Sequence, residues 1–182
     1  MKWLIASDLH GSASCCRQIL ERFDAEKAQR LILLGDTLYH GPRNPLPEGY
    51  DPKAVFTMLN ERKEVITAVR GNCDAPVDQW VLEFPIMVDY QVLTLGSRRF
   101  FITHGDRWSR DNPPSLPAGS VLVCGHIHLA AAEKQGNWFY LNPGSPALPH
   151  DDFQGYLTVE EQAAQLKNLS GETVKNCRLK IS

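Results

Sequence analysis

Aspartate, asparagine and histidine residues recur directly after short apolar runs at five places along the chain. The seven residues concerned are Asp8, His10, Asp36, Asn72, His104, His126 and His128. Each alone is most simply a helix cap or a turn residue. Together they are a set of oxygen and imidazole groups without thiolates, which suits Mn²⁺, Fe²⁺, Co²⁺ or Zn²⁺. The sequence therefore predicts a metal site, provided that the fold brings these groups together.

The spacing of two pairs supports such a site. Asp8 and His10 are two residues apart, and so are His126 and His128. On an extended or loop backbone, side chains with this spacing can point to one side and reach one ion or two adjacent ions. Glycines beside the motifs, such as Gly35 and Gly125, allow sharp backbone turns and keep bulk away from an ion.

Three apolar runs predict the buried parallel strands that position the first groups. They cover residues 2–6, 30–34 and 65–69. Helical spacing begins at Ser14, and a second helix is predicted from residue 52 to about residue 62, with Asp51 as its cap. Because strand ends on one edge of a sheet converge, we expect the polar residues after these strands to meet there.

The chain beyond residue 85 is richer in hairpin signals. Gly96-Ser97 separates two predicted strands, another buried strand is predicted at residues 121–124, and residues 130–141 read as a second hairpin. Residues 160–169 are compatible with an amphipathic helix, but the alternation around them favours strands. The sum is one α/β domain over residues 1–182, with two sheets and helices outside.

Composition restricts the choice of partner and compartment. The 182 residues are 43% hydrophobic and 22% charged with a net charge of −2, so we see no strong nucleic-acid signal. Apolar runs are too short for a signal peptide or for the roughly 20 residues that span a bilayer. We expect a cytoplasmic protein without a membrane partner. Five cysteines without a CxxC pair argue against a disulfide framework and a thiolate zinc site.

The order of the motifs resembles that of the calcineurin-like metallophosphoesterases. The motifs are Asp8-Leu9-His10, Gly35-Asp36, Gly71-Asn72-Cys73-Asp74, His104 and Gly125-His126-Ile127-His128. The chain length, the loop at 40–44 and Asn142-Pro-Gly-Ser145 make the chain most similar to the small bacterial YfcE-type phosphodiesterases. The resemblance implies a calcineurin-like β-sandwich of two mixed sheets flanked by helices, in an αββα arrangement.

The resemblance also implies a dinuclear centre. One ion would be held by Asp8, His10, Asp36 and His128, and the other by Asp36, Asn72, His104 and His126. Two divalent ions per chain are implied, with Mn²⁺ expected first and Fe, Co, Ni or Zn as alternatives. The implied reaction is hydrolysis of a small phosphodiester by a metal-bridging hydroxide, with Asp36 and Asn72 at the catalytic centre. Two ions, two aspartates and a hydroxide leave a charge of about +1 for an anionic substrate.

Two positions depart from the family pattern. Cys73 stands where the family has a histidine thought to protonate the leaving group, and Tyr39 stands where an aspartate orients that histidine. Because all seven ligands remain, we expect a working hydrolase without the usual general acid, which is typically worth ~10²–10⁴-fold in rate. Cys73 either donates a proton or, as we favour, fills the histidine's space as a neutral thiol.

The loop after Tyr39 contains two further candidates. His40 is a substitute acid or else an exposed loop histidine, and the two interpretations are about equal. Arg43 either donates two hydrogen bonds to a substrate phosphate or is an exposed loop arginine. Asn142 to Ser145 predict a turn beneath the metal site. His150 has no partner in the sequence and receives no role.

Three other functions remain open from the sequence. A phosphomonoesterase or a nucleotide pyrophosphatase is an alternative enzyme, but a monoester dianion needs more positive charge than Arg43 and Arg70 supply, which favours diesters. A non-catalytic module like the retromer scaffold subunit is the third, and the intact ligands favour an enzyme over it.

A homo-oligomer, dimer or higher, is expected from base rates alone.

Overall fold

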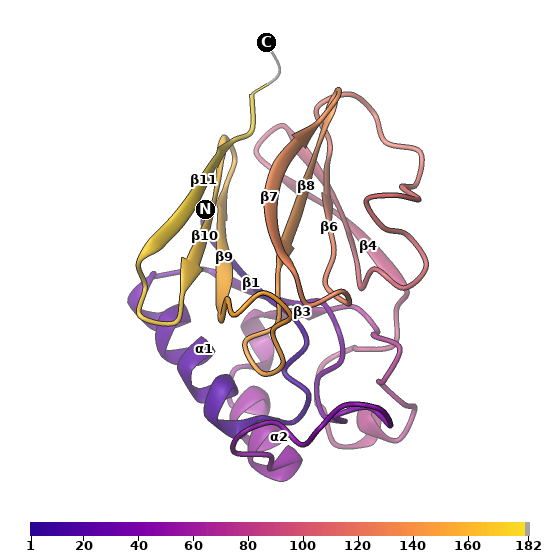
Figure 1. Cartoon of the computed structure of the whole chain (residues 1–182), viewed down its shortest axis with the longest axis vertical. Helices are drawn as coiled ribbons and strands as arrows, with labels where there is room; N and C mark the ends of the chain where they lie inside the picture. Colours follow the sequence, from indigo (N-terminus) through magenta and orange to yellow (C-terminus); the bar gives the residue numbers. More distant parts are fainter. Residues whose placement is uncertain (181–182) are drawn as a thin grey trace.

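Residues 1–180, which the computed structural model describes, form two mixed β-sheets that pack face to face (Figure 1). The first has the strand order β11-β10-β9-β1-β2-β3 and the second the order β4-β5-β6-β8-β7. The strands of the first sheet are β1 (Trp3–Ala6), β2 (Arg30–Leu33), β3 (Ile66–Ala68), β9 (Gly155–Glu160), β10 (Ala163–Asn168) and β11 (Thr173–Arg178). Those of the second are β4 (Tyr90–Leu95), β5 (Arg98–Thr103), β6 (Val121–Val123), β7 (Ala130–Gln135) and β8 (Trp138–Pro143).

Each sheet has a parallel part that ends at the candidate site. Strands β1, β2 and β3 run parallel in the first sheet, and β5, β6 and β8 run parallel in the second. The remaining strands pair antiparallel. The carboxyl ends of β1, β2 and β3 therefore lie along one edge, and the segments that follow them contain the first four predicted ligands.

Two helices cover the outer face of the first sheet (Figure 1). Helix α1 spans Ala13–Ala25 and α2 spans Pro52–Asn60, with short 3₁₀ turns at Lys63–Val65 and Asp78–Trp80. The cap predicted for α2 at Asp51 is confirmed, and α1 has a cap at Ser12 that the sequence analysis did not name. Ser12 Oγ accepts from the Cys15 backbone N–H. The side chain of Asp51, which directly precedes Pro52, accepts from the Ala54 backbone N–H.

The alternation within β1 explains its uninterrupted apolar sequence. Trp3 and Ile5 belong to the core between the sheets, whereas Leu4 and Ala6 lie beneath the helices. Since successive side chains of a strand point to opposite faces, a central strand covered on both faces must be apolar throughout. The segment after β1 is therefore anchored on both sides where it enters the site.

The outer face of the second sheet is covered by the segment between β5 and β6. In that segment, Trp108 meets Phe101 edge-on with ring centres 5.5 Å apart, and Leu116 packs against the buried cluster of Leu122, Cys124 and Tyr140. Helices α1 and α2 both lie against the first sheet. An irregular segment thus covers the outer face of the second sheet, as the two helices cover that of the first.

The predicted α/β class of two mixed sheets is confirmed, with small shifts at the ends of the elements, but in the described part of the chain both α-helices lie on the first sheet, so the helical layer that αββα implies for the second sheet is replaced by an irregular segment. Residues 163–168 form β10 between β9 and β11, so the strand interpretation of the ambiguous C-terminal segment is correct. Within residues 1–180, neither helix has the length and apolarity needed to cross a membrane, and α1, the longer one, has 13 residues.

Candidate metal centre

The structure brings the seven predicted ligands together where the strands end. Asp8 follows β1, Asp36 follows β2 and Asn72 follows β3. His104 comes directly after β5, and the pair His126 and His128 comes shortly after β6. Groups from both sheets therefore meet, although up to 120 positions separate Asp8 from His128 along the chain.

One group of contacts joins Asp8, His10 and His128. The Nε2 atoms of His10 and His128 are 3.2 Å apart, and Asp8 Oδ1 lies 3.2 Å from His128 Nε2 and 3.7 Å from His10 Nε2. All three residues are buried. Their three ligand atoms are close enough together to bind one ion.

A second group joins Asn72, His104 and His126. His104 Nε2 lies 3.0 Å from Asn72 Oδ1 and 3.2 Å from His126 Nδ1. Asp36 lies between the two groups, because its Oδ2 is 3.5 Å from His104 Nε2 and 3.8 Å from His10 Nε2. This placement is compatible with the bridging position that the resemblance implies for Asp36.

Backbone carbonyls orient three of the histidines. The Nδ1 atoms of His10, His104 and His128 lie 2.9, 2.7 and 2.6 Å from the carbonyl oxygens of Tyr39, Leu34 and Leu148, respectively. A carbonyl oxygen only accepts, so each Nδ1 carries the hydrogen and, in the neutral ring, each Nε2 carries the lone pair. Three lone pairs therefore point into the centre, as in metal-binding histidines that are held from outside.

The geometry of the first group fits a shared cation. Two nitrogen ligands, each about 2.0–2.1 Å from one ion, lie roughly 3 Å apart, as His10 Nε2 and His128 Nε2 do here. Asp8 Oδ1 is buried and, among residues 1–180, has no hydrogen-bond partner. A buried carboxylate oxygen without a donor is costly unless a cation satisfies it. The donor set of oxygen and imidazole suits a divalent metal.

Backbone conformation explains how the ligands point inward. Asp8, His10, Asp36, His126 and His128 all have positive φ, between 47° and 68°. They are five of the seven non-glycine residues with positive φ in the described part of the chain. This region is sparsely populated and each such residue costs about 1–3 kcal/mol. Its concentration at the ligands shows that the surrounding contacts, rather than local preference, set their direction.

Two glycines leave room for this arrangement. A Cβ atom at Gly71 would collide with Asp36 Oδ1, and one at Gly125 would collide with Ser7 Oγ and with Asp8 Oδ2. Neither glycine has positive φ. The sequence interpretation of sharp turns is thus incomplete, because these two positions need glycine mainly for the close approach of a carboxylate or a neighbouring side chain.

The carboxylate of Asp74 connects the turns after β2 and β3. It accepts the backbone N–H groups of Asp36 and Thr37, each at 2.9 Å, and of Gly71 at 2.7 Å. The residue is buried, with 8% of its surface exposed. Sequence reasoning placed Asp74 in a motif without giving it this role. In the sequence, an aspartate shortly after Gly-Asn indicates that its side chain accepts a backbone N–H within its own turn. The sequence does not indicate the bonds that Asp74 accepts from the Gly35-Asp36 motif.

Two further carboxylates continue this connection. Asp36 Oδ1 accepts from Cys73 N at 2.8 Å, and Asp8 Oδ2 accepts from His126 N at 3.0 Å. Asn142 and Pro143 end β8 rather than form a turn, but the predicted place of this segment beneath the site is correct. Asn142 Nδ2 donates to the Gly125 carbonyl at 2.9 Å, and Ser145 Oγ donates to the Asp8 carbonyl at 2.8 Å.

Charges in the site shift the pKa values of its residues. Burial raises the pKa of Asp8, but the His128 ring, 3.2 Å from Oδ1, and the charges that His104 and His128 carry when protonated outweigh it and bring the pKa to about 2. For His104 and His128 the effects have the opposite signs. Burial lowers their pKa values, but the nearby carboxylates of Asp8 and Asp36 and the carbonyl acceptors outweigh burial and raise both pKa values above 6.5. Burial and then the charge of His104 lower the pKa of His126.

Two groups beside the ligands have raised pKa values. Burial, followed by the charge of Asp36, raises the pKa of the Cys73 thiol to about 12. Burial also raises the pKa of Asp74, against the effect of the three N–H groups that it accepts. Cys73 is therefore a thiol at neutral pH.

A cavity of about 190 Å³ opens over the ligands. Its wall is made by His10, Asp36, Gly41, Pro42, Arg43, Asn44, Asn72, Cys73, His126, His128 and His150. The predicted loop residue Arg43 is in this wall, and so is His150, to which the sequence assigned no role. His40 lies outside it, because its ring meets those of Tyr39 and Tyr50 edge-on at 4.7 and 5.3 Å.

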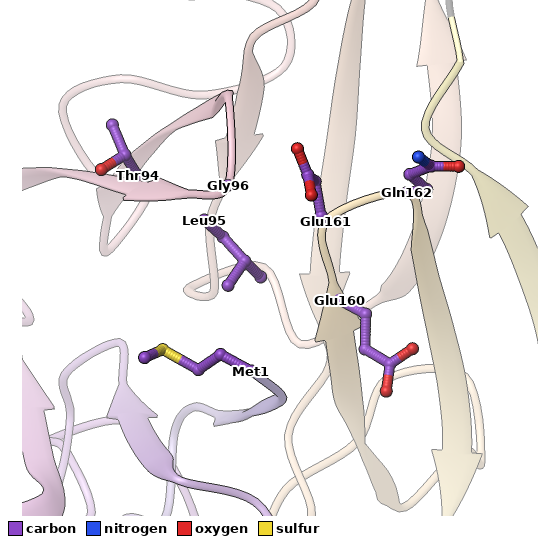
Figure 2. A pocket seen from close by; sticks show the side chains of 7 residues that line it. All are labelled: Met1, Thr94, Leu95, Gly96, Glu160, Glu161 and Gln162. Carbon is purple, nitrogen blue, oxygen red and sulfur yellow. The ribbon is translucent and has the colours of Figure 1, made fainter.

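A larger cavity of about 610 Å³ lies at the opposite ends of β1 and β5. Figure 2 shows Glu160, the last residue of β9, and Glu161, which follows it, across from the turn at Gly96, with the Glu160 side chain directed away from Met1. Glu161 Oε1 already accepts from both N and Oγ of Ser97. These contacts join the two hairpin turns, so the hollow is explained by the packing of the turns and is not a candidate centre.

The role of Asp74 leads to a stability prediction. Replacing Asp74 with Asn removes an acceptor oxygen and the charge, so buried N–H groups lose their partner. We expect the free energy of unfolding of the metal-free protein to fall by about 1.5–3 kcal/mol, measured by urea denaturation. Asp78→Asn is the matched control, since the Asp78 side chain accepts a single N–H, from Ala75, and should cost less than about 1 kcal/mol. Equal losses in the two variants would contradict the connecting role of Asp74.

The histidine pKa values predict opposite pH responses with and without metal. In the metal-free protein the pKa values of His104 and His128 are raised by folding, so protonation of these rings stabilises the folded state. This contribution is fully present below pH 6.5, the ordinary pKa of histidine, and is lost as the pH rises through the folded-state pKa values. Bound metal requires neutral imidazoles, so its stabilisation should grow over the same range. His126 and Asp8 titrate at lower pH. Thermal unfolding at about pH 6 and about pH 8, with and without Mn²⁺, tests this. A metal-free Tm that rises between these pH values would refute it.

Comparison with known proteins identifies the family. A model of the calcineurin-like phosphoesterase superfamily domain matches residues 1–164. The phosphodiesterase YfcE of Escherichia coli (strain K12) is 49% identical over 149 residues, which cover 82% of this chain and 81% of that protein. A solved structure of the E. coli phosphoesterase YfcE superimposes with a TM-score of 0.96 at 41% identity, covering 99% of this chain and 100% of that one.

A more distant structure shares the fold alone. Vacuolar protein sorting 29 from Cryptosporidium parvum superimposes with a TM-score of 0.64 at 18% identity, over 97% of each chain. The family model, in contrast, covers most of this chain, and the YfcE sequence is similar over more than two thirds of it. The chain belongs to the calcineurin-like phosphoesterase superfamily.

Proposed function

We propose that this phosphoesterase is a metal-dependent phosphodiesterase with two ions per chain. The observation that carries the proposal is the meeting of Asp36 with the six other predicted ligands, with three histidine lone pairs directed inward and one aspartate oxygen without a donor in the described chain. The similarity to a protein named phosphodiesterase YfcE supports it.

The contacts suggest which residues would hold each ion. Asp8, His10, Asp36 and His128 would hold one, while Asp36, Asn72, His104 and His126 would hold the other, with Mn²⁺ first and Fe, Co, Ni or Zn as alternatives. When bound, a pair of divalent ions supplies an acidified water and stabilises charge on the phosphoryl oxygens. The residues of the chain provide the fixed positions that such a pair requires.

The charge of the cavity wall favours a diester. Among the described residues that form the wall, Arg43 is the one lysine or arginine. Arg70 pairs with Asp89 at 2.8 Å, and Arg107 pairs with the other oxygen of the same carboxylate at 2.8 Å. A diester carries one negative charge and a monoester up to two, so a single free guanidinium suits the diester. In our proposal Arg43 contacts the phosphate of the substrate.

The region around Cys73 supports a preference for good leaving groups. A general acid works best with a pKa near the working pH, whereas burial and the charge of Asp36 raise the pKa of Cys73 to about 12. Tyr39 brings no carboxylate, and its backbone carbonyl accepts from His10. A poorly acidic alcohol needs a proton to leave, but a phenol does not. Aryl diesters should therefore react faster than alkyl diesters.

The alternatives make different demands on the same site. A phosphomonoesterase or nucleotide pyrophosphatase would need more positive charge in the wall than Arg43 provides. A non-catalytic interaction module would not need a complete ligand set, although the fold alone does not exclude one, since vacuolar protein sorting 29 shares it. The seven ligand residues and their held orientations favour the enzyme.

Hydrolysis of a matched set of substrates tests the proposal. The Mn²⁺-loaded protein should hydrolyse a bis-aryl diester faster than the corresponding aryl monoester, and faster than an alkyl diester. Cys73→Ala should leave aryl diester turnover within a few-fold, because it removes neither a ligand nor a useful acid. Faster monoester hydrolysis would reject the diester assignment. Loss of aryl diester turnover in Cys73→Ala, with metal content unchanged, would show that the thiol takes part directly.

A further inference from the structure

The segment between β8 and β9 is bonded to two of the ligand motifs. Its residue Ser145 donates to the Asp8 carbonyl at 2.8 Å, and its Leu148 carbonyl lies 2.6 Å from His128 Nδ1. The backbone N–H of His150 donates to the His128 carbonyl at 3.1 Å. Asp151 Oδ2 then accepts from Ala130 N at 2.9 Å. His150 is therefore held in register with His128 by bonds on both sides of it.

The ring of His150 lies at the mouth of the cavity over the metal ligands. Its centre is 5.0 Å from that of His128, with the ring planes tilted by 39°. The residue is exposed, yet it belongs to the cavity wall together with Arg43 and Cys73. Since His128 Nε2 faces the centre, the neighbouring ring of His150 is positioned beside whatever occupies the cavity.

We propose that His150 binds the substrate by donating a ring N–H to a non-bridging oxygen of the phosphate. This inference rests on the proposed phosphodiesterase function and extends it. An imidazole offers an N–H in either tautomer, so the contact does not depend on the protonation state of the ring. Arg43 approaches from a different loop, and two donors on separately anchored segments fix the orientation of a phosphate better than one does.

The same geometry distinguishes His150 from His40. The sequence placed His40 close to the Gly-Asp motif, but its ring packs between Tyr39 and Tyr50 and lies outside the cavity wall. Both histidines are outside the set of seven ligands. They form a natural pair for comparison, since one faces the cavity and the other faces the loop.

Substitution of the two histidines in the metal-loaded protein tests the proposal. His150→Ala should lower kcat/KM for an aryl diester by about 10- to 100-fold, as expected for loss of a hydrogen bond to a charged group. It should weaken the binding of inorganic phosphate, measured by calorimetry, and leave the metal content at the wild-type value. His150→Gln, which keeps an N–H at similar reach, should recover part of both losses. His40→Ala should have the smaller effect on phosphate binding.

Several outcomes would overturn the assignment. His150→Ala with kcat/KM and phosphate affinity both within two-fold of wild type would remove the contact. Loss of metal in His150→Ala would show that the residue acts through His128 instead. A larger loss of phosphate affinity in His40→Ala than in His150→Ala would reverse the roles of the two residues. If the wild type hydrolysed no diester, the proposed function would fail, and phosphate binding would still decide whether His150 contacts phosphate.

Discussion

Three hydrogen bonds to one buried carboxylate hold the centre of this site together. Asp74 accepts from Gly71 in its own turn and from Asp36 and Thr37 in the turn after β2. These bonds connect the two turns, of which one positions Asn72 and the other positions Asp36. Because the Asp36 side chain in turn accepts from Cys73 N, the two turns are linked in both directions. Hydrogen bonds to a charged acceptor are about twice as strong as neutral ones, which makes this link a firm base for the remaining ligands.

Hydrogen bonds also hold the remaining predicted ligands, both within the first sheet and between the two sheets. Asp8 is bonded to His126 N, and the three histidines with a backbone partner are oriented by carbonyls rather than by side chains. This network maintains five of the predicted ligands at positive φ, a sparsely populated conformation that only surrounding contacts can hold. The cost is compensated when ligands are already in place for a cation, since no further reorganisation is needed on binding. Held ligands around an open cavity are what a phosphoryl transfer site requires.

Much of this arrangement could be predicted from the sequence, but not all of it. The apolar runs located the strands, and their polar ends indicated that the seven predicted ligands lie close together, whereas their binding of metal stays a prediction. The contribution of Asp74 was missed because two of its three bonds reach a turn 37 or 38 positions away. His150 was missed because its place depends on the fold of the segment after β8. His40 was a candidate substitute acid because it follows Tyr39, with an exposed loop histidine as the equal alternative, and in the structure its ring packs against those of Tyr39 and Tyr50.

Metal stoichiometry directly tests the proposal that two ions share Asp36. Elemental analysis of the Mn²⁺-loaded protein should approach two equivalents per chain, and Asp36→Asn should lose both ions and the activity, because Asp36 lies within 3.8 Å of ligands in both groups. Asp89→Asn, which changes a carboxylate outside the cavity wall, is the control and should retain two. One equivalent in the wild type, or two in Asp36→Asn with full turnover, would contradict the account.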